Sequence, residues 1–143
     1  MKNGPLLALV AGNDEDVLAD ISLVMNLCFQ NWHVETTNCL AKCIEIANNK
    51  DTGLIILDKD LADGDGFDAL TKIRQFSNTP VIFLSDMDDG EDLVKALDRG
   101  ADEYITKPFR LTEFAAHIRS LTRNRSDLVI RKLNTRIIKE GGE

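Results

Sequence analysis

The stretch Leu54-Ile55-Ile56-Leu57-Asp58 places four consecutive apolar residues directly before a carboxylate. Runs of the same kind occupy 6–11 and 81–84, and Pro80, which suits the start of a strand, precedes the second of them. Strands that are apolar at successive positions are buried on both faces, as in a parallel sheet covered by helices. The stretch therefore predicts a central strand of a parallel sheet that carries Asp58 at its carboxyl end.

Segments with helical periodicity separate the apolar runs. In 16–29, for example, Val17, Ile21 and Val24 recur at the spacing of one helix face. The expected strands are 6–11, 34–36, 54–57, 81–84 and 104–106, and the expected helices are 16–29, 39–48, 67–74, 89–99 and 111–122. Helical crossovers between parallel strands cover both faces of a sheet. We therefore predict a doubly wound α/β fold, a (βα)5 arrangement around a five-stranded parallel sheet.

Composition narrows the classes of function. The 143 residues carry a net charge of −7, so the general field of the protein does not favour binding to nucleic acid. No apolar run approaches the roughly 20 residues that cross a bilayer, and no membrane partner is expected. The first five residues hold one lysine and no small-residue cleavage site, so we expect a cytoplasmic protein.

The three cysteines, Cys28, Cys39 and Cys43, are an odd number and do not suggest a disulfide framework. Cys39 and Cys43 are four residues apart, which puts them on one face of a helix. They could form half of a metal site, but neither histidine lies close by in the sequence to complete a ligand set. The favoured interpretation is that they are small buried apolar residues.

Polar residues with complementary chemistry follow the strong strands. Asp58 ends the stretch quoted above, Ser85 follows the run at 81–84, and Lys107 follows the strand at 104–106. Ligand sites of such sheets lie at the carboxyl ends of the strands, where these side chains are expected to meet. A carboxylate can attack a phosphoryl group, while lysine and a hydroxyl can meet its oxygens. The set predicts a phosphate-accepting site.

Four segments resemble the receiver domain of two-component response regulators. They are Leu54 to Asp58, Asp63-Gly64-Asp65-Gly66-Phe67, Val81 to Ser85, and Gly100-Ala101-Asp102-Glu103-Tyr104-Ile105-Thr106-Lys107-Pro108-Phe109. The resemblance covers residues 5–123 and implies a flavodoxin-like fold with strand order 2-1-3-4-5. It makes Asp58 the phosphoacceptor, Ser85 the switch hydroxyl, Lys107 the phosphate-binding lysine and Tyr104 the switch aromatic. It also implies a cis Lys107–Pro108 bond. For Tyr104, an ordinary half-buried strand tyrosine is an equal alternative.

The resemblance also implies partners. A sensor histidine kinase supplies the phosphoryl group, and the domain is a regulatory module, not an enzyme. A small aspartyl-phosphate phosphatase is disfavoured because nothing resembles a substrate-binding cap. Receivers of the winged-helix (OmpR/PhoB-like) class of transcription regulators form homodimers through the fourth helix, fifth strand and fifth helix. On that surface we expect Asp102 to pair with Arg119, and Lys95 or Arg99 to pair with Glu103, across a two-fold axis.

Residues 124–143 do not fit the receiver pattern. They resemble the opening strands of the winged-helix DNA-binding domain of that class. We expect a linker or the truncated start of such a domain, so that DNA is bound only through a domain absent from this chain. The alternative is a disordered tail.

The chain departs from the family pattern around Asp58. The acidic pair that follows the first strand in the family aligns with Gly12 and Asn13. The expected Mg²⁺ ligands are Asn13, Asp14, Asp58 and the backbone carbonyl of Asp60. A register shift that places Asp14 and Glu15 in the pair is less favoured, because it moves Gly12 and Asn13 into the strand.

A further departure follows the switch hydroxyl, where Asp86 replaces the small residue of the family. Its negative charge repels an incoming phosphoryl group. With fewer acidic ligands, Mg²⁺ binding is expected to be weak or absent. Two interpretations stay open: a slowly phosphorylated switch, and a phosphate-independent receiver that acts as an interaction and dimerisation module.

Overall fold

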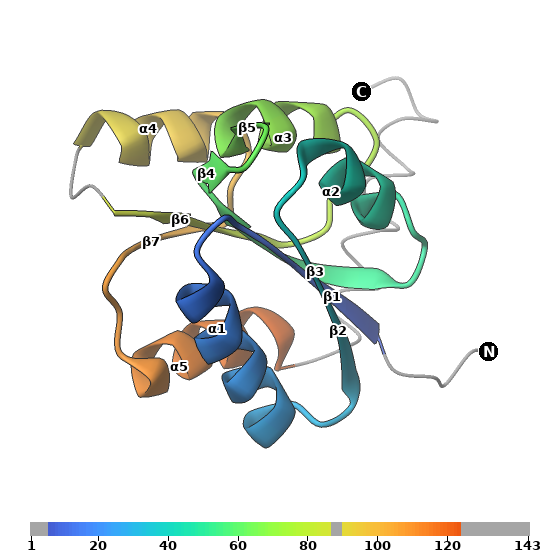
Figure 1. Ribbon diagram of the computed structural model, residues 1–143, viewed down its shortest axis with the longest axis vertical. Coiled ribbons are helices and arrows are strands. Elements are labelled where there is room, and N and C mark those ends of the chain that lie inside the picture. The colour runs from blue at the N-terminus through green and yellow to red at the C-terminus, as the bar shows by residue number, and fades with distance from the viewer. Residues whose placement is uncertain (1–5, 87–89, 124–143) are drawn as a thin grey trace.

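The computed structural model describes residues 6–86 and 90–123, so the segment 124–143 with its expected linker lies outside the described residues. The main sheet has five parallel strands in the order β2-β1-β3-β6-β7 (Figure 1). The strands are β1 Leu6–Ala11, β2 Trp32–Thr37, β3 Thr52–Asp58, β6 Val81–Ser85 and β7 Glu103–Thr106. Counted along the chain within this sheet, the order is 2-1-3-4-5, which confirms the predicted doubly wound fold.

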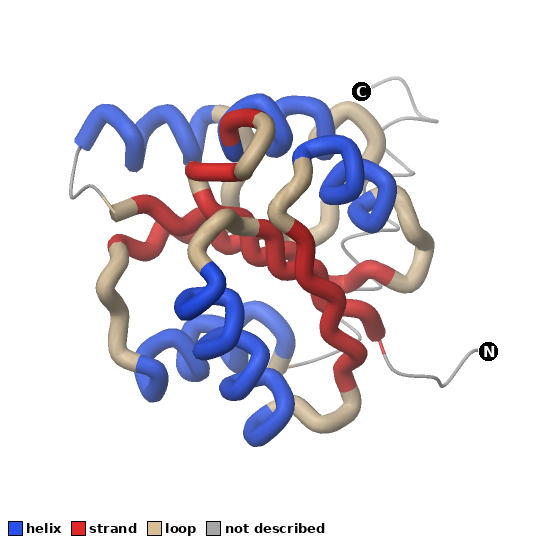
Figure 2. Tube along the Cα trace, viewed as in Figure 1, coloured by secondary structure: helices blue, strands red, loops and turns tan. Residues whose placement is uncertain are grey.

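Helices cover both faces of the sheet, as Figure 2 shows. They are α1 Glu15–Cys28, α2 Leu40–Ala47, α3 Gly66–Ile73, α4 Gly90–Asp98 and α5 Leu111–Thr122. Helices α1 and α5 lie on one face, and α2, α3 and α4 lie on the other (Figure 1). The described helix ends differ from the predicted ones by no more than one residue, whereas β2 is longer than its weak apolar pattern predicts.

The central strand β3 is buried at every position because helices pack on both of its faces. Ile55 and Leu57 belong to the core beneath α2, α3 and α4, whereas Leu54 and Ile56 belong to the core beneath α1 and α5. Full burial of such a side chain contributes about 1.5–3 kcal/mol. This strand therefore supports both halves of the fold and holds its last residue, Asp58, in a fixed position.

A short antiparallel ribbon follows β3, between the expected strand 54–57 and the expected helix 67–74. It consists of β4 Asp60–Leu61 and β5 Gly64–Asp65. The N–H of Gly66 donates to the Lys59 carbonyl at 2.7 Å. A Cβ atom at Gly66 would lie 2.9 Å from Lys59 Cα, so this close approach of two backbones requires glycine. The ribbon thus returns the chain to the end of β3, next to Asp58.

Helix α4 is packed less deeply than its neighbours. Among its described residues it buries only Ala96, and Leu93, Val94 and Leu97 are 39%, 56% and 45% exposed. Gly100 follows α4 with φ 107°, the left-handed conformation expected of a helix-ending glycine. In 6–86 and 90–123, no helix combines the length and apolar character needed to cross a membrane.

Candidate functional site

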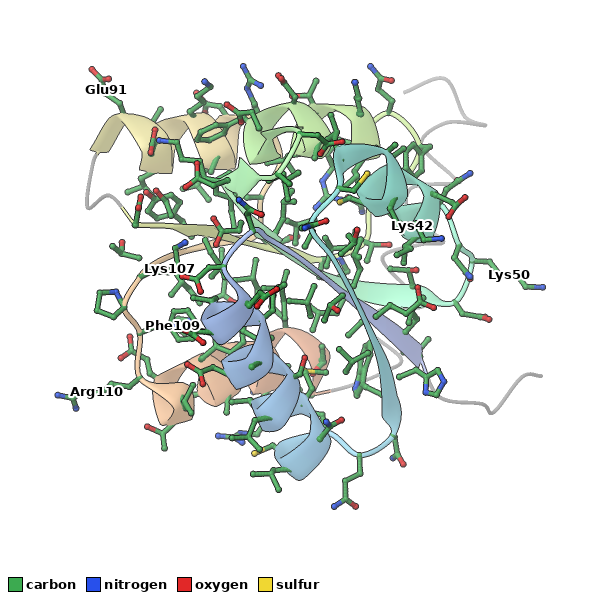
Figure 3. The ribbon with its side chains drawn as sticks, viewed as in Figure 1. Lys42, Lys50, Glu91, Lys107, Phe109 and Arg110 are labelled. Carbon is green, nitrogen blue, oxygen red and sulfur yellow. The ribbon has the colours of Figure 1, made fainter. Side chains whose placement is uncertain are left out.

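Asp58 lies at the carboxyl end of β3, as predicted, with a side chain that is 4% exposed. Its Oδ2 accepts a hydrogen bond from Lys107 Nζ at 2.7 Å, and its Oδ1 accepts one from the backbone N–H of Asp60 at 3.0 Å. Lys107 directly follows β7 (Figure 3), and the Lys107–Pro108 bond is cis, as expected. The parallel sheet therefore brings together a carboxylate and an ammonium that are 49 residues apart in the sequence.

Ser85 ends β6, the strand between β3 and β7, and is fully buried. Its Oγ donates a hydrogen bond to Asp92 Oδ2 at 3.3 Å. Lys59 Nζ donates to the same oxygen at 2.8 Å, and this bond is the main reason why the pKa of the Lys59 ammonium is raised. Lys59 and Asp92 thus belong to the site, although sequence reasoning gave neither a role. The only sequence signal was the position of Lys59 directly after Asp58.

Gly12 lies next to Asp58 at the end of β1. A Cβ atom at Gly12 would lie 3.1 Å from Asp58 Cβ and 3.6 Å from Asp58 Oδ2, so any side chain here would face the carboxylate. Glycine supplies no ligand at this position, and the neighbouring Asn13 is an exposed, neutral residue. The site therefore lacks carboxylates at the two positions that the resemblance aligns with the acidic pair of receivers.

Asp14, one of the expected metal ligands, is the N-cap residue of α1. Its Oδ1 accepts hydrogen bonds from the backbone N–H groups of Asp16 at 3.0 Å and Val17 at 3.3 Å. Over 6–86 and 90–123, the structure has no group of three or more His, Cys, Asp or Glu side chains that could hold a metal ion. The oxygen donors near Asp58 suit Mg²⁺ in kind but provide little negative charge.

Tyr104 lies half-buried on β7, where its ring stacks on Phe83 with a centroid distance of 6.4 Å. Phe83 stacks in turn on Phe67 at 4.7 Å. Tyr104 therefore extends an aromatic row that packs in the core beneath α3 and α4. This position suits an ordinary strand tyrosine, and its movement together with Ser85 stays a prediction.

Comparison with known proteins agrees with the fold. Residues 8–119 match the response regulator receiver domain family. The chain belongs to this family. One relative is the transcriptional regulatory protein KdpE of Mycobacterium tuberculosis (strain ATCC 25618 / H37Rv), which is 38% identical over 117 residues that cover 82% of this chain and 51% of KdpE. The chain spans about half the length of the curated relatives it matches.

Solved structures share the receiver fold. DrrB, an OmpR/PhoB homologue of Thermotoga maritima, is 26% identical with a TM-score of 0.67, covering 80% of this chain and 51% of DrrB. The receiver domain of the sensor histidine kinase PA1611 from Pseudomonas aeruginosa PAO1 is 18% identical with a TM-score of 0.73, covering 85% of this chain and all of that domain (100%). The PA1611 structure has a magnesium ion coordinated in its active-site cleft.

Of the two cysteines expected to be small buried apolar residues, Cys43 fits that interpretation, whereas Cys39 is partly exposed. Cys43 is fully buried in the core, and burial raises the pKa of its thiol to about 12. Cys39 is the N-cap residue of α2, and its Sγ donates to Asp63 Oδ2 at 3.4 Å. The backbone N–H of Leu40 donates to Asp63 Oδ1 at 2.7 Å and is the main cause of the lowered pKa of Asp63. Asp63 therefore caps α2 from a distant loop, a role that the sequence did not indicate.

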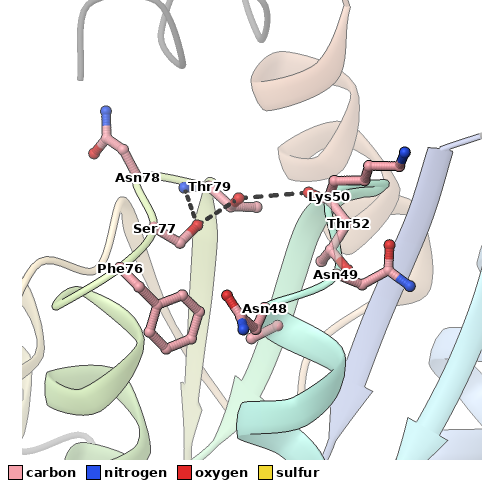
Figure 4. Close-up of a pocket in the computed structure, with 9 residues that line it drawn as sticks. Asn48, Asn49, Lys50, Thr52, Phe76, Ser77, Asn78 and Thr79 are labelled. Carbon is pink, nitrogen blue, oxygen red and sulfur yellow. Dashed lines mark hydrogen bonds between the residues drawn. The ribbon is translucent and has the colours of Figure 1, made fainter. Parts of the chain in front are cut away.

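Pockets occur at both edges of the sheet. A pocket of about 430 Å³ lies beside the Asp58 site, where Gly12, Asn13 and Thr37 line it. Another, of about 250 Å³, lies between the loops 48–50 and 76–79 (Figure 4). There Thr79 Oγ1 donates to the carbonyl of Thr52 at 3.4 Å, next to the amino ends of β3 and β6. Because the strands are parallel, this second pocket lies at the edge opposite Asp58 and outside the candidate site.

Proposed function

We propose that this receiver accepts a phosphoryl group on Asp58 from a sensor histidine kinase and thereby controls a transcription regulator. The supporting observation is a buried carboxylate at the end of β3 whose Oδ2 lies 2.7 Å from Lys107 Nζ. The curated relatives include transcriptional regulators, and this chain spans about half their length. Binding to DNA would therefore belong to a further domain of the full regulator.

In the proposed reaction, an Asp58 carboxylate oxygen attacks the phosphorus atom of a phosphohistidine. A P–O bond forms as the P–N bond breaks, and the released histidine nitrogen takes up a proton. Lys107 keeps its proton and shifts its hydrogen bond to a phosphoryl oxygen, while Ser85 Oγ donates to another. Phosphoryl transfer of this kind depends mainly on positioning and on positive charge around the transferred group.

Mg²⁺ would be held by Asp58, the side-chain oxygen of Asn13 and the backbone carbonyl of Asp60. It would neutralise part of the charge on the phosphoryl oxygens. Asp14 would join this set only by giving up the hydrogen bonds that cap α1. With Asp58 as its main carboxylate, the set should bind Mg²⁺ weakly.

Acetyl phosphate, with and without Mg²⁺, tests the proposal when the products are followed by intact-mass spectrometry. The wild-type chain should gain one phosphoryl group, and Asp58→Asn should gain none. Asp20→Asn is a matched control because Asp20 is an exposed aspartate on α1. Equal labelling of Asp58→Asn and wild type would contradict the assignment of Asp58. Labelling of no variant would favour the phosphate-independent receiver, which the neutral Gly12 and Asn13 positions also favour.

We further propose that the receiver forms a homodimer through α4, β7 and α5. The exposed Leu93, Val94 and Leu97 of α4 supply an apolar patch on this surface. Exposed ion pairs are worth only about 0–1 kcal/mol each, so apolar contacts must provide most of the affinity.

The ion pairs expected across the dimer have partners within the chain. Asp102 Oδ2 accepts hydrogen bonds from Arg74 Nη2 at 3.1 Å and from the Val81 N–H at 2.8 Å. Glu103 pairs with His117. The proposed pairs to Arg119, and to Lys95 or Arg99, would compete with these contacts, so the dimer proposal rests on α4.

Analytical sedimentation of two charge-introducing variants tests this dimer. Val94→Glu on α4 should weaken it, whereas Leu23→Glu on α1, also at an exposed apolar position, should not. A protein that is monomeric at high concentration, with and without a phosphoryl analogue, would contradict the proposal.

A further inference from the structure

The Asp92 carboxylate attaches the amino-terminal turn of α4 to the candidate site. Asp92 lies in this turn, and its side chain is 13% exposed. Its Oδ2 accepts hydrogen bonds from Ser85 Oγ at 3.3 Å and from Lys59 Nζ at 2.8 Å. One carboxylate oxygen therefore binds both the hydroxyl at the end of β6 and the ammonium of Lys59, the residue that directly follows Asp58.

A phosphoryl group on Asp58 would compete for the same two donors. It carries a charge of about −1.5 to −2 and three acceptor oxygens, whereas a carboxylate carries one negative charge on two oxygens. Lys59 Nζ and Ser85 Oγ contact the same Asp92 oxygen, so both donors lie at one place beside the end of β3. Asp92 and a phosphoryl group are thus acceptors of the same kind, and the phosphoryl group is the stronger one.

We propose that Asp92 is an internal anion that occupies Ser85 and Lys59, and that a phosphoryl group on Asp58 displaces it and releases the amino-terminal turn of α4. This inference rests on the proposed phosphorylation of Asp58. It adds that Asp92 determines how the first turn of α4 responds to the phosphoryl group. Lys59 then joins Lys107 as a second cation facing the phosphoryl group. That extra charge matters here because Gly12 and Asn13 leave the site poor in ligands for Mg²⁺.

The packing of α4 explains why this contact controls its first turn. The helix buries only Ala96 among its described residues. Contacts with α3 come from the later part of α4 and from Arg99, which directly follows the helix: Lys95 Nζ lies 4.3 Å from the centroid of the Phe67 ring, and Arg99 Nη1 lies 3.2 Å from Thr71 Oγ1. A carboxylate as buried as Asp92 is destabilised when its donors leave, so it moves toward water. The first turn should therefore loosen while the second half stays on α3.

Hydrogen–deuterium exchange of the 143-residue chain without any phosphoryl analogue tests the Asp92 contact alone. Amides in the first half of α4 should exchange about tenfold faster in Asp92→Asn than in wild type, a factor equivalent to about 1.4 kcal/mol, whereas those in its second half should change little. Asp98→Asn is the matched control, because it makes the same charge change at an exposed position of the same helix. Unchanged exchange in β3 would show that the variant stays folded. Equal exchange of α4 in the two variants would overturn the proposal.

Beryllofluoride with Mg²⁺, a mimic of the phosphoryl group, tests the displacement. It should bind Asp92→Asn about tenfold more tightly than wild type, since no internal anion has to leave. Lys59→Gln should have opposite effects on the two measurements: faster exchange of α4, but weaker binding of beryllofluoride. Equal affinity in wild type and Asp92→Asn would overturn the displacement. Faster α4 exchange without beryllofluoride binding in any variant would support the Asp92 contact and count against phosphorylation of Asp58.

Discussion

Replacing Lys107 by methionine removes the ammonium that holds Asp58 and retains an apolar side chain of similar length. The side chains of Lys107 and Asp58 are 13% and 4% exposed, so water replaces the lost partner poorly. At 2.7 Å, two unit charges attract by about 6 kcal/mol at an effective dielectric constant of about 20. Much of that attraction offsets the desolvation of the two ions, and breaking a buried pair costs about 3–5 kcal/mol. The Asp60 N–H remains bound to Asp58, so we expect Lys107→Met to lower the free energy of unfolding by about 2–3 kcal/mol.

Urea unfolding followed by the fluorescence of Trp32, the single tryptophan, measures this change. Adding Asp58→Asn to Lys107→Met should recover about half of the loss or more, because a neutral amide needs no counterion. Lys42→Met is the matched control, since Lys42 and Glu45 are 2.6 Å apart but 56% and 67% exposed, and it should change stability little. A Lys107→Met variant as stable as Lys42→Met would refute the reasoning, as would a double variant no more stable than Lys107→Met.

Other predictions address the metal, the helix cap and the thiols. Gly12→Asp with Asn13→Asp should tighten Mg²⁺ binding about tenfold in calorimetry, because it adds carboxylates to a hard cation, and equal affinities would contradict the proposed ligand set. The pKa of Asp63 in the folded protein is lowered below its ordinary 3.8, so the charged side chain stabilises the fold above pH 3.8. This stabilisation is lost as the pH falls through the lowered pKa of the folded state. Asp63→Asn should therefore be less stable than wild type near neutral pH, with a difference that shrinks below pH 3.8; a pH-independent difference in urea unfolding would argue against the cap. Cys28 should react with iodoacetamide in the native protein, whereas buried Cys43 should react only after unfolding, and mass spectrometry of the labelled peptides distinguishes the two.

The two interpretations of the site lead to different expectations for α4. In a phosphorylated switch, the phosphoryl group would compete with Asp92 for Ser85 and Lys59, and α4 would respond to the kinase. In a phosphate-independent receiver, Asp92 would keep both donors, and the exposed apolar patch of α4 would be available at all times. Exchange of α4 measured before and after treatment with acetyl phosphate separates these cases.

The sequence by itself determined the sheet and the identity of the residues at its carboxyl edge. Burial on both faces demands continuous apolar residues, so β3 and β6 were evident from their composition. Parallel strands end at one edge, and for that reason the sequence alone predicts that Asp58, Ser85 and Lys107 lie near one another. The helices followed from their apolar periodicity, with small errors at their ends.

Only the tertiary structure decided which side chains contact one another. Lys59 and Asp92 are 33 residues apart in the sequence. Asp63 lies 23 residues from Leu40, whose backbone N–H donates a hydrogen bond to it. Local patterns of hydrophobicity report which face is buried but not which distant polar groups meet, because those contacts depend on how helices cross the sheet. Asp14 shows the same limit close to the site. A carboxylate after β1 can serve either a metal or a helix; in the structure Asp14 caps the N–H groups at the start of α1, and its role as a Mg²⁺ ligand stays a prediction.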